Sequence, residues 1–260
     1  MYQEERMKLI MDHLANAGRI SIEEICHQFD VSRDTARRDL IKLEEQDLIV
    51  RTRGGALLPS PIQEFKNYKD RLVTVSEEKK KIGKLAAALV RKGDRIILDS
   101  STTVQACAEF LHAEHCTVIT NSINSADLLS EKDSVHIRLL GGILHKEHRY
   151  VYGASVIEAL SNYYVEKSFI GVGGITTDGL SADDEEGKVK RKMMEQAEMV
   201  IVLADHSKFG RNYFYRFADW SLVDVIITDQ LPSSTMMDFF EQHQVEVLVP
   251  DSSEEQEELS

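Results

Sequence analysis

Apolar residues recur at helical spacing near the start of the chain. Met7, Ile10, Met11 and Leu14 lie three or four positions apart, as on one face of an α-helix. Gly18 follows them, and glycine tolerates the left-handed backbone that often ends a helix. We therefore expect a first helix that stops near Gly18.

A second helix is predicted directly after this glycine. Ser21 and Glu24 have the spacing of a capping box, in which each side chain bonds the backbone amide of the other residue. Ile20 can pack against Ile25 as a hydrophobic staple. The helix is expected to run to about Phe29.

A third helix is predicted after only residues 30–31. Ser32 can cap its first amides, and Ala36, Leu40 and Leu43 share one face. Two helices joined by so short a turn form a helix-turn-helix.

The outward face of the third helix is basic. If the apolar face packs in the core, an angle of about 100° per residue directs four residues outward, namely Asp34, Thr35, Arg38 and Lys42. Arg37 lies at the flank of this outward face. Arginine suits bidentate contact with guanine edges or phosphate, and a helix fits the major groove of DNA. We expect Thr35, Arg37 and Arg38 to contact DNA.

A predicted hairpin follows in the sequence LIVRTRGGALL, residues 48–58. Two short β-prone stretches flank the turn at Gly54 and Gly55, with arginines beside it, so this hairpin is predicted to be the wing of a winged helix-turn-helix. The set of residues predicted to contact DNA is Ser32, Arg33, Thr35, Arg37, Arg38, Lys42, Arg51 and Arg53. In an alternative interpretation, the arginines form a solvated face and pair with Asp34, Asp39 and Glu44.

A change of pattern after residue 58 predicts a second domain. Pro59 and Pro61 interrupt regular structure, which indicates a linker over residues 59–70 between a DNA-binding domain (1–58) and a larger domain (71–250). In the larger domain, the apolar runs RIILD, CTVIT, VHIRLL, KSFIGV, MVIVLAD and VDVIITD alternate with amphipathic or glycine-rich stretches. Such alternation predicts an α/β domain with an open, mostly parallel sheet covered by helices.

Small and hydroxyl-bearing residues follow several of the predicted strands. The first strand ends at Asp99 and is followed by Ser101, Thr102 and Thr103, just before a helix expected from about Val104. Later strands end in Thr120-Asn121-Ser122, Gly141-Gly142 and Gly171-Val172-Gly173-Gly174. Ligands of open α/β sheets bind at the carboxyl ends of strands, and hydroxyls with free amides at a helix N-terminus can hold a phosphate. In the structural alternative, the same hydroxyls are only helix caps.

Two further segments add charge to this region. They are DDEEGKVKRKMM, where Glu186 and Lys190 stand at i, i+4, and ADHSKFGR, where Lys208 lies just past a strand end. A carboxylate can accept hydrogen bonds from sugar hydroxyls, and an ammonium can pair with phosphate. Alternatively, Glu186 and Lys190 form a solvated ion pair and Lys208 is an ordinary surface lysine.

The net charge of −13 argues at first against a nucleic-acid partner. However, acidic residues crowd a tail that is predicted to be unstructured, residues 251–260, while basic residues crowd residues 33–53. A local basic surface on an acidic protein therefore remains compatible with DNA binding.

The remaining composition is typical of a cytosolic protein. The 260 residues contain no run of about 18 apolar residues and no apolar N-terminal signal, which predicts a cytoplasmic protein without a membrane partner. The three cysteines form no C-x-x-C pair and are expected to be reduced packing residues.

The ordered motifs resemble the DeoR family of bacterial regulators. SRDTARRDLIKLEEQDLIVRTRGGALL is similar to that family's S-x-x-T-x-R-R-D-L helix and R-x-x-GGA wing, and DSSTT, TNS, LLGG, FIGVGGI, EGKVKRKM and DHSKFG follow in the order of its sensor domain. The resemblance implies a fold related to ribose-5-phosphate isomerase and CoA-transferases, with a sugar phosphate or similar metabolite as effector. Carried over by position, the effector pocket comprises Asp99, Ser101, Thr102, Thr103, Asn121, Ser122, Gly142, Gly173, Glu186, Lys190 and Lys208.

This chain departs from the family pattern at two places. Ser101 replaces the commoner glycine of DSGTT and adds a side chain to the predicted phosphate loop. Val172-Gly173 lacks the acidic or polar residue often found in F-x-G-x-x-G-I, which weakens the expectation of a sugar-hydroxyl contact there.

The combined pattern predicts a repressor of a carbohydrate-metabolism operon rather than an enzyme. Its expected partners are double-stranded operator DNA, a phosphorylated effector and further copies of the chain, as a dimer or tetramer; no catalytic residue, cofactor or metal is predicted. Three alternatives stay open. They are a sugar-phosphate isomerase using Asp99, Glu186 and Lys208, a metal site at His112-x-x-His115-Cys116 or His145-x-x-His148, and a protein-interaction module.

Overall fold

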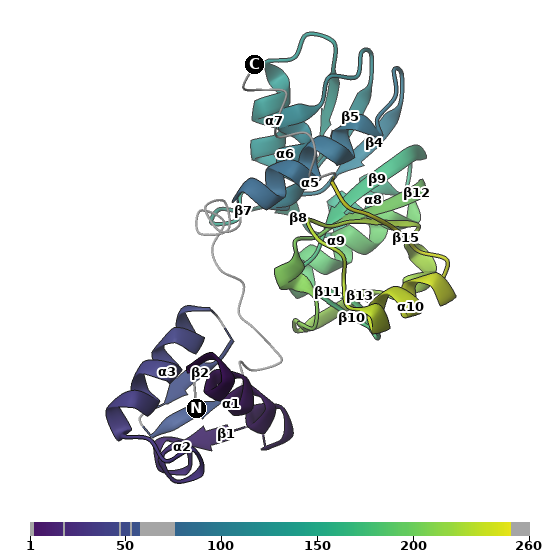
Figure 1. Ribbon diagram of the computed structural model, residues 1–260. Coiled ribbons are helices and arrows are strands. Elements are labelled where there is room, and N and C mark those ends of the chain that lie inside the picture. The colour runs from purple at the N-terminus through teal and green to yellow at the C-terminus, as the bar shows by residue number, and fades with distance from the viewer. Residues whose placement is uncertain (1–2, 18, 47, 53, 58–75, 251–260) are drawn as a thin grey trace, which may run out of the picture. The chain divides into compact units, whose positions relative to one another are not determined.

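The computed structural model of the protein describes residues 3–17, 19–46, 48–52, 54–57 and 76–250. The chain divides into two compact units, Met1–Gln63 and Glu64–Ser260, and each is described by itself (Figure 1). The predicted helix stop Gly18, the wing residue Arg53, the predicted linker and the acidic tail lie outside the described residues.

The N-terminal unit contains the three predicted helices and the predicted wing. The helices are α1 (Gln3–Ala17), α2 (Ile22–Phe29) and α3 (Arg33–Glu45), and the wing strands are β2 (Val50–Thr52) and β3 (Gly55–Leu57). The capping box is formed, since Ser21 N donates to Glu24 Oε2 over 2.7 Å and Glu24 N donates to Ser21 Oγ over 3.1 Å. Ser32 caps α3 by accepting from Thr35 N over 3.2 Å.

A short strand that the sequence pattern did not predict completes this unit. β1 (Arg19–Ser21) pairs antiparallel with β3, which gives a three-stranded sheet of order β1-β3-β2. Gly55 allows this pairing, because a Cβ at that position would lie 2.0 Å from the carbonyl oxygen of Ile20. The helices pack around one core whose buried members include Ile10, Leu14, Ile25, Ala36, Leu40 and Leu43.

The C-terminal unit is built on the predicted parallel sheet. Its seven strands have the order β15-β14-β12-β9-β4-β5-β6 and all pair in parallel. The strands are β4 (Arg95–Leu98), β5 (Thr117–Thr120), β6 (His136–Leu139), β9 (Val165–Gly171), β12 (Ala197–Leu203), β14 (Val225–Ile227) and β15 (Glu246–Leu248). The first six match the predicted apolar runs, whereas β15 was not predicted.

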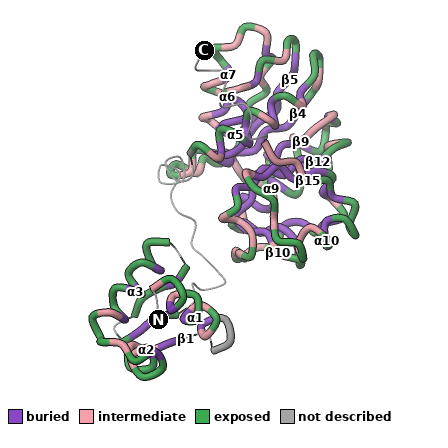
Figure 2. Tube along the Cα trace, viewed as in Figure 1, coloured by how far each residue is buried: buried purple, intermediate pink, exposed green. Residues whose placement is uncertain are grey.

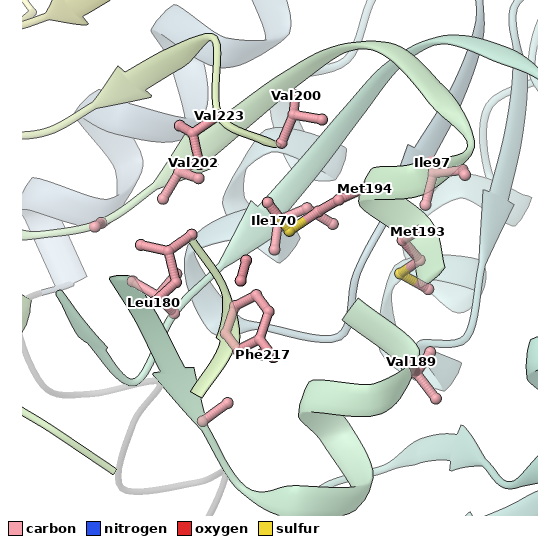
Figure 3. Packing of buried hydrophobic residues seen from close by; sticks show 14 of the residues in the cluster. Ile97, Ile170, Leu180, Val189, Met193, Met194, Val200, Val202, Phe217 and Val223 are labelled. Carbon is pink, nitrogen blue, oxygen red and sulfur yellow. The ribbon is translucent and has the colours of Figure 1, made fainter. Parts of the chain in front are cut away.

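Helices cover both faces of this sheet. One buried cluster joins Ile96, Leu98 and Phe169 to α5 (Ser76–Ala88), α6 (Thr102–Phe110) and α7 (Ile123–Ser130). The other joins Ile97 and Ile170 to α8 (Ala154–Leu160), α9 (Asp184–Glu195) and α10 (Ser234–Gln242), and part of it is drawn in Figure 3. Figure 2 shows the central strands buried between these two layers, as the continuous apolar runs predict.

Two small antiparallel elements, both unpredicted, complete the C-terminal unit. One is the sheet of β10 (Gly174–Thr176), β11 (Gly179–Ala182) and β13 (Tyr215–Ala218), and the other is the hairpin of β7 (Ile143–His145) and β8 (Tyr150–Tyr152).

Cys107 and Cys116 are buried free thiols, and burial raises the pKa of Cys107 to about 12. Within the described ranges, none of the helices has the length and apolar character needed to cross a bilayer.

Candidate DNA-contact surface and sensor site

The side chains predicted to contact DNA lie on the outside of α3 and the wing. Thr35 is half-buried, and the other described members are exposed, namely Ser32, Arg33, Arg37, Arg38, Lys42 and Arg51. The apolar face of α3 is buried as predicted, with Ala36, Leu40 and Leu43 at most 1% exposed. The helix therefore presents a basic face on one side and packs with the other.

Several of these cations have partners within the unit. Arg37 lies 3.6 Å from Asp34, and Arg51 lies 3.3 Å from Glu44, so part of the alternative interpretation is present. All four side chains are at least 36% exposed. Exposed pairs of this kind contribute little free energy, which leaves the arginines available to exchange partners for phosphate.

Asp39 does not pair with the outward arginines, contrary to that alternative. Its side chain is fully buried and accepts from Arg6 Nε over 2.6 Å, from Arg6 Nη2 over 3.1 Å and from Gln3 Nε2 over 2.8 Å. Asp39 is thus a structural residue that ties α3 to α1.

In the C-terminal unit, the predicted pocket residues cluster at one edge of the sheet. Of the predicted residues, Asp99 follows β4 and Asn121 follows β5. Gly171, which ends β9, and Asp205, two residues after β12, lie in the same row but were not predicted as pocket residues. These strands are parallel and the sheet places β5, β4, β9 and β12 side by side, so their carboxyl ends form one continuous row.

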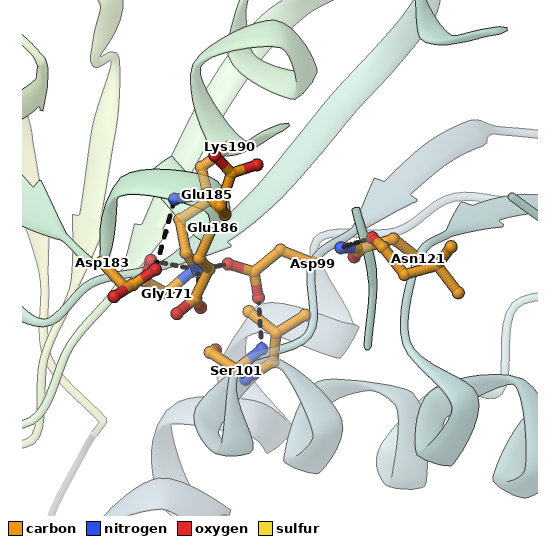
Figure 4. Close-up of polar contacts among 10 residues, drawn as sticks. Asp99, Ser101, Asn121, Gly171, Asp183, Glu185, Glu186 and Lys190 are labelled. Carbon is orange, nitrogen blue, oxygen red and sulfur yellow. Dashed lines mark hydrogen bonds and ion pairs between the residues drawn. The ribbon is translucent and has the colours of Figure 1, made fainter. Parts of the chain in front are cut away.

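A buried ionic cluster lies in the middle of this row (Figure 4). Lys190 of α9 donates to Asp99, lies 2.9 Å from Glu186 Oε1 and donates to the carbonyl oxygen of Gly171 over 2.9 Å. Asp99 in turn accepts from Ser101 N over 2.7 Å and from Gly171 N over 2.8 Å. An ammonium has three donors, so Lys190 is saturated by protein acceptors.

The cluster keeps Lys190 charged. Burial by itself would lower the pKa of Lys190, but the carboxylates of Asp99 and Glu186 raise it above its ordinary value. Neither Lys190 nor Asp99 is more than 2% exposed. Glu186 and Lys190 are therefore not the solvated pair of the structural alternative. They belong to a buried network that fixes the ends of β4, β9 and α9 relative to one another.

The hydroxyls at the helix starts serve first as caps. Ser101 Oγ accepts from Val104 N over 3.1 Å at the start of α6, and Ser122 Oγ accepts from Ser125 N over 3.1 Å at the start of α7. The structural alternative for these two serines is therefore present in the molecule. Thr102, in the first turn of α6, is only 7% exposed.

Ser101 also explains the glycine at the end of β9. A Cβ on Gly171 would lie 2.0 Å from Ser101 Oγ and 2.3 Å from Ser101 Cβ. Ser101, which stands where the family more commonly has glycine, is thus packed against Gly171 of the neighbouring strand β9.

The other predicted pocket residues differ in what they offer a ligand. Asn121 donates to the carbonyl of Val151 over 3.0 Å, while its buried Oδ1 has no hydrogen-bond partner among the described residues. Gly142 is needed for packing, since a Cβ there would lie 2.6 Å from the carbonyl oxygen of Tyr152. Gly173 is buried, and its amide donates to the carbonyl of Ser181 over 3.0 Å.

Lys208 lies at the carboxyl ends of the same strands, beside Asp205, whose pKa is lowered in spite of burial by Lys208 and also by Lys79. The sequence pattern singled out neither Asp205 nor Lys79. Lys208 Nζ is 4.0 Å from Asp205 Oδ2, and Asp205 is 1% exposed. Lys79, in the first turn of α5, is 6% exposed. Lys79 stands in a run of three lysines, and nothing in that run marks it as the buried one.

At His145-x-x-His148, one site of the metal alternative, His148 N donates to His145 Nδ1 over 3.2 Å and the two rings lie in contact. The rings of His145 and His148 are 4.7 Å apart and His145 stacks on Tyr150. Among the described residues, no group of three or more His, Cys, Asp or Glu side chains is placed to hold a metal ion.

A winged helix-turn-helix with a basic recognition helix, followed by an α/β unit with a polar strand-end site, defines a DNA-binding transcription regulator with a sensor domain. The model of the DeoR-like helix-turn-helix domain matches residues 6–61, and the model of the DeoR C terminal sensor domain matches residues 74–230. The chain belongs to the DeoR family, as the motif resemblance predicts.

Curated relatives match along nearly the whole chain. HTH-type transcriptional repressor GlcR of Bacillus subtilis (strain 168) is 57% identical over 255 residues, covering 98% of this chain and 99% of the relative. Glycerol-3-phosphate regulon repressor of Escherichia coli (strain K12) is 34% identical over 250 residues, covering 95% and 99%.

A solved structure gives a much more distant match. Ribose 5-phosphate isomerase A from Methanocaldococcus jannaschii aligns with 51% of this chain and 54% of its own length, at 18% identity and a TM-score of 0.37. A likeness this low supports no argument about function.

Proposed function

We propose that the protein is a repressor of a carbohydrate-metabolism operon that binds operator DNA through α3 and the wing and responds to a phosphorylated sugar or related metabolite. The observation that carries the effector half is the row of buried polar groups at the carboxyl ends of β5, β4, β9 and β12. The relatives named as transcriptional repressors, one of a glycerol-3-phosphate regulon, support the same reading of the whole chain. Its place of action is the cytoplasm.

The proposed pocket separates into a frame and a set of ligand contacts. Asp99, Glu186 and Lys190 form the frame, because their contacts are largely satisfied within the protein. The first backbone amides of α6, Asn121 Oδ1 and Lys208 are the groups that would contact the effector.

Copies of the chain are proposed to act together on DNA. One helix-turn-helix provides few base contacts, so two copies on paired half-sites about one or two helical turns apart would supply the affinity. The effector would then shift the population of DNA-competent arrangements of the units.

The DNA half is tested with Arg38→Ala and the matched control Arg91→Ala, an exposed arginine of the sensor unit. Fluorescence anisotropy with duplexes from the protein's own promoter region should show weaker binding for Arg38→Ala and a salt slope reduced by about one, because one phosphate or base contact is lost. Arg91→Ala should bind like the wild type. Equal affinity of both variants would remove α3 from the interface.

The effector half is tested with Lys208→Ala. This variant should bind the duplex as the wild type does, while phosphorylated sugars no longer change its affinity for DNA. Turnover of ribose 5-phosphate by the purified protein would instead favour the isomerase alternative, which uses Asp99, Glu186 and Lys208 as acid and base.

A further inference from the structure

Gln3 links a buried carboxylate to an exposed cation of the candidate DNA-contact surface. Its Nε2 donates to Asp39 Oδ1 over 2.8 Å, and its Oε1 accepts from Lys42 Nζ over 2.6 Å. Asp39 is fully buried, Gln3 is half-buried and Lys42 is exposed. One amide therefore joins the first residue of α1 to two residues of α3 that lie three positions apart.

Simple chemistry decides which way this amide points. A carboxylate that is paired with arginine only accepts hydrogen bonds, so the NH2 group of Gln3 must face Asp39 and its carbonyl must face away. Asp39 is itself held in place by Arg6, which donates to both of its oxygens. The orientation of Gln3 Oε1 is thus set from inside the unit, and the carbonyl presents a fixed acceptor to Lys42.

Lys42 keeps its charge and most of its donors in this arrangement. An ammonium has three N–H donors, and Gln3 takes one of them. Among the described residues, no carboxylate forms an ion pair with Lys42, whereas Arg37 pairs with Asp34 on the same helix. A neutral amide holds the lysine without neutralising it. Two donors and the full positive charge remain for an anion.

The position of Lys42 on α3 suits a contact with the DNA backbone. It lies four residues beyond Arg38, so the two side chains are one turn apart on the outward face, and it belongs to the last turn of the helix. In a helix-turn-helix, the N-terminal residues of the recognition helix contact base edges, which leaves a cation of the last turn to meet phosphate. Phosphate contacts fix the register and orientation of a protein on the duplex.

We propose that Gln3 is a positioning residue for DNA binding, which holds the ammonium of Lys42 in the free protein where a backbone phosphate of the operator binds. This deepens the proposed function and rests on its DNA half. Without Gln3, the four-carbon chain of Lys42 samples many rotamers, and the phosphate contact must order it. With Gln3, part of that ordering is complete before the duplex arrives.

The proposal separates the position of Lys42 from its charge. Ordering one long side chain on binding lowers the affinity by about 2- to 10-fold, so removal of Gln3 should cost about that much. The number of phosphates neutralised sets the salt dependence, and Gln3 carries no charge. Loss of Gln3 should therefore weaken binding without changing the salt slope, whereas loss of Lys42 should lower both.

The test is a double-variant cycle on the full-length protein, with Gln3→Ala, Lys42→Ala and the variant that carries both changes. Gln46→Ala is the matched control, because Gln46 is an exposed glutamine that directly follows α3. Affinity for duplexes from the protein's own promoter region is measured by fluorescence anisotropy between about 50 and 200 mM salt. Urea unfolding followed by far-UV circular dichroism shows whether each variant is folded.

Lys42→Ala should bind more weakly than the wild type, with a salt slope reduced by about one. Gln3→Ala should bind about 2- to 10-fold more weakly with the wild-type slope. The variant with both changes should bind as Lys42→Ala does, because Gln3 then has no cation to position. Gln46→Ala should match the wild type.

A second variant covers the case in which Gln3→Ala does not fold. Gln3→Met keeps the length of the side chain and removes both of its polar atoms, so it takes the place of Gln3→Ala in the cycle with the same expected results.

Three results would overturn the proposal alone. Equal losses of affinity from Gln3→Ala with and without Lys42 would show that Gln3 acts on the fold of α3 through Asp39. Wild-type affinity of Gln3→Ala would leave the glutamine without a role in binding. Wild-type affinity and slope of Lys42→Ala would remove the lysine from the interface, while Arg38→Ala still decides the DNA half of the proposed function. A wild-type protein that binds none of the duplexes overturns both, and this result needs no variant.

Discussion

Arg6 and Asp39 form a buried ion pair between α1 and α3, with Nε 2.6 Å from Oδ2 and Nη2 3.1 Å from Oδ1. The hydrogen bond from Arg6 to Asp39 raises the pKa of the arginine, in spite of the opposing effect of burial. The pair lies on the packed side of α3, so it positions the helix that carries the candidate DNA contacts.

Asp39→Asn should destabilise the N-terminal unit by about 3–5 kcal/mol, because it leaves a buried guanidinium without its counter-charge. Urea unfolding followed by far-UV circular dichroism should show an early transition for this unit. Fluorescence of Trp220, which lies in the other unit, should keep its wild-type midpoint.

The matched control is Arg33→Ala, which breaks an exposed pair with Glu23 in the same unit. It should cost less than about 1 kcal/mol. Equal effects of the two substitutions would show that the Arg6–Asp39 pair has no special structural weight.

Gly171→Ala should destabilise the sensor unit by about 1–3 kcal/mol, because the new Cβ would lie 2.0 Å from Ser101 Oγ. Ser101→Gly alone should cost only a few tenths, as expected when glycine replaces a serine cap. In the double variant, the clash is gone and most of the loss should be recovered. The free energies of unfolding come from urea titrations followed by Trp220 fluorescence. If the effects of the two single substitutions simply added in the double variant, this coupling would be contradicted.

Lys190→Met should lower the free energy of unfolding of the sensor unit by about 3–5 kcal/mol, since the carboxylates of Asp99 and Glu186 remain buried without a cation. Lys188→Met on the same helix is the control. Lys188 pairs with Asp184 and Glu185 but is 41% exposed, so its loss should cost less than about 1 kcal/mol. If both variants lost a similar amount of unfolding free energy, the buried cluster around Lys190 would contribute no more than an exposed ion pair.

Acid should weaken the sensor unit through Glu166. Hydrogen bonds from Arg95, including 2.7 Å from its backbone amide to Oε2, hold the pKa of Glu166 at about 2, against an ordinary value of 4.5. The stabilisation is complete above pH 4.5 and is lost as the pH falls from 4.5 towards 2. Arg95 is 61% exposed, so solvent screening limits the effect to less than about 1 kcal/mol.

The check is the difference in urea midpoint between wild type and Glu166→Gln from pH 7 to pH 3. That difference should shrink as the pH falls, because the variant lacks the titrating carboxylate. A constant difference across the range would contradict the assignment.

Long periodic segments made the fold predictable, and short ones did not. The apolar runs predicted six strands of the parallel sheet, because central strands that are covered on both faces carry apolar residues at most positions; β6, at the edge of the sheet, is largely exposed. β1 and β15 span three residues each, too few to show a period. The antiparallel strands β10, β11 and β13 come together only in the folded unit, since β13 lies over thirty positions beyond β11.

The sequence pattern predicted many positions of the candidate site, but not which of their side chains would be buried and paired within the protein. Asp39 stands three positions after Ala36 and four before Leu43, so helical spacing already placed it near the buried face. By contrast, nothing local shows that Lys190 meets Asp99, ninety-one positions away. Asp205 and Lys79 were missed because their burial arises from packing of α5 against distant strands.

The start of α5 has a mechanical consequence. This helix begins at Ser76, the first described residue after the segment that joins the two units, and Lys79 lies three residues further on. At 1.5 Å of rise per residue, about 4.5 Å of helix separates Ser76 from Lys79, which lies close enough to Asp205 at the strand ends to lower the pKa of that carboxyl. Any change at the strand ends that moved Lys79 would therefore act on the helical turn that directly follows the connection between the two units.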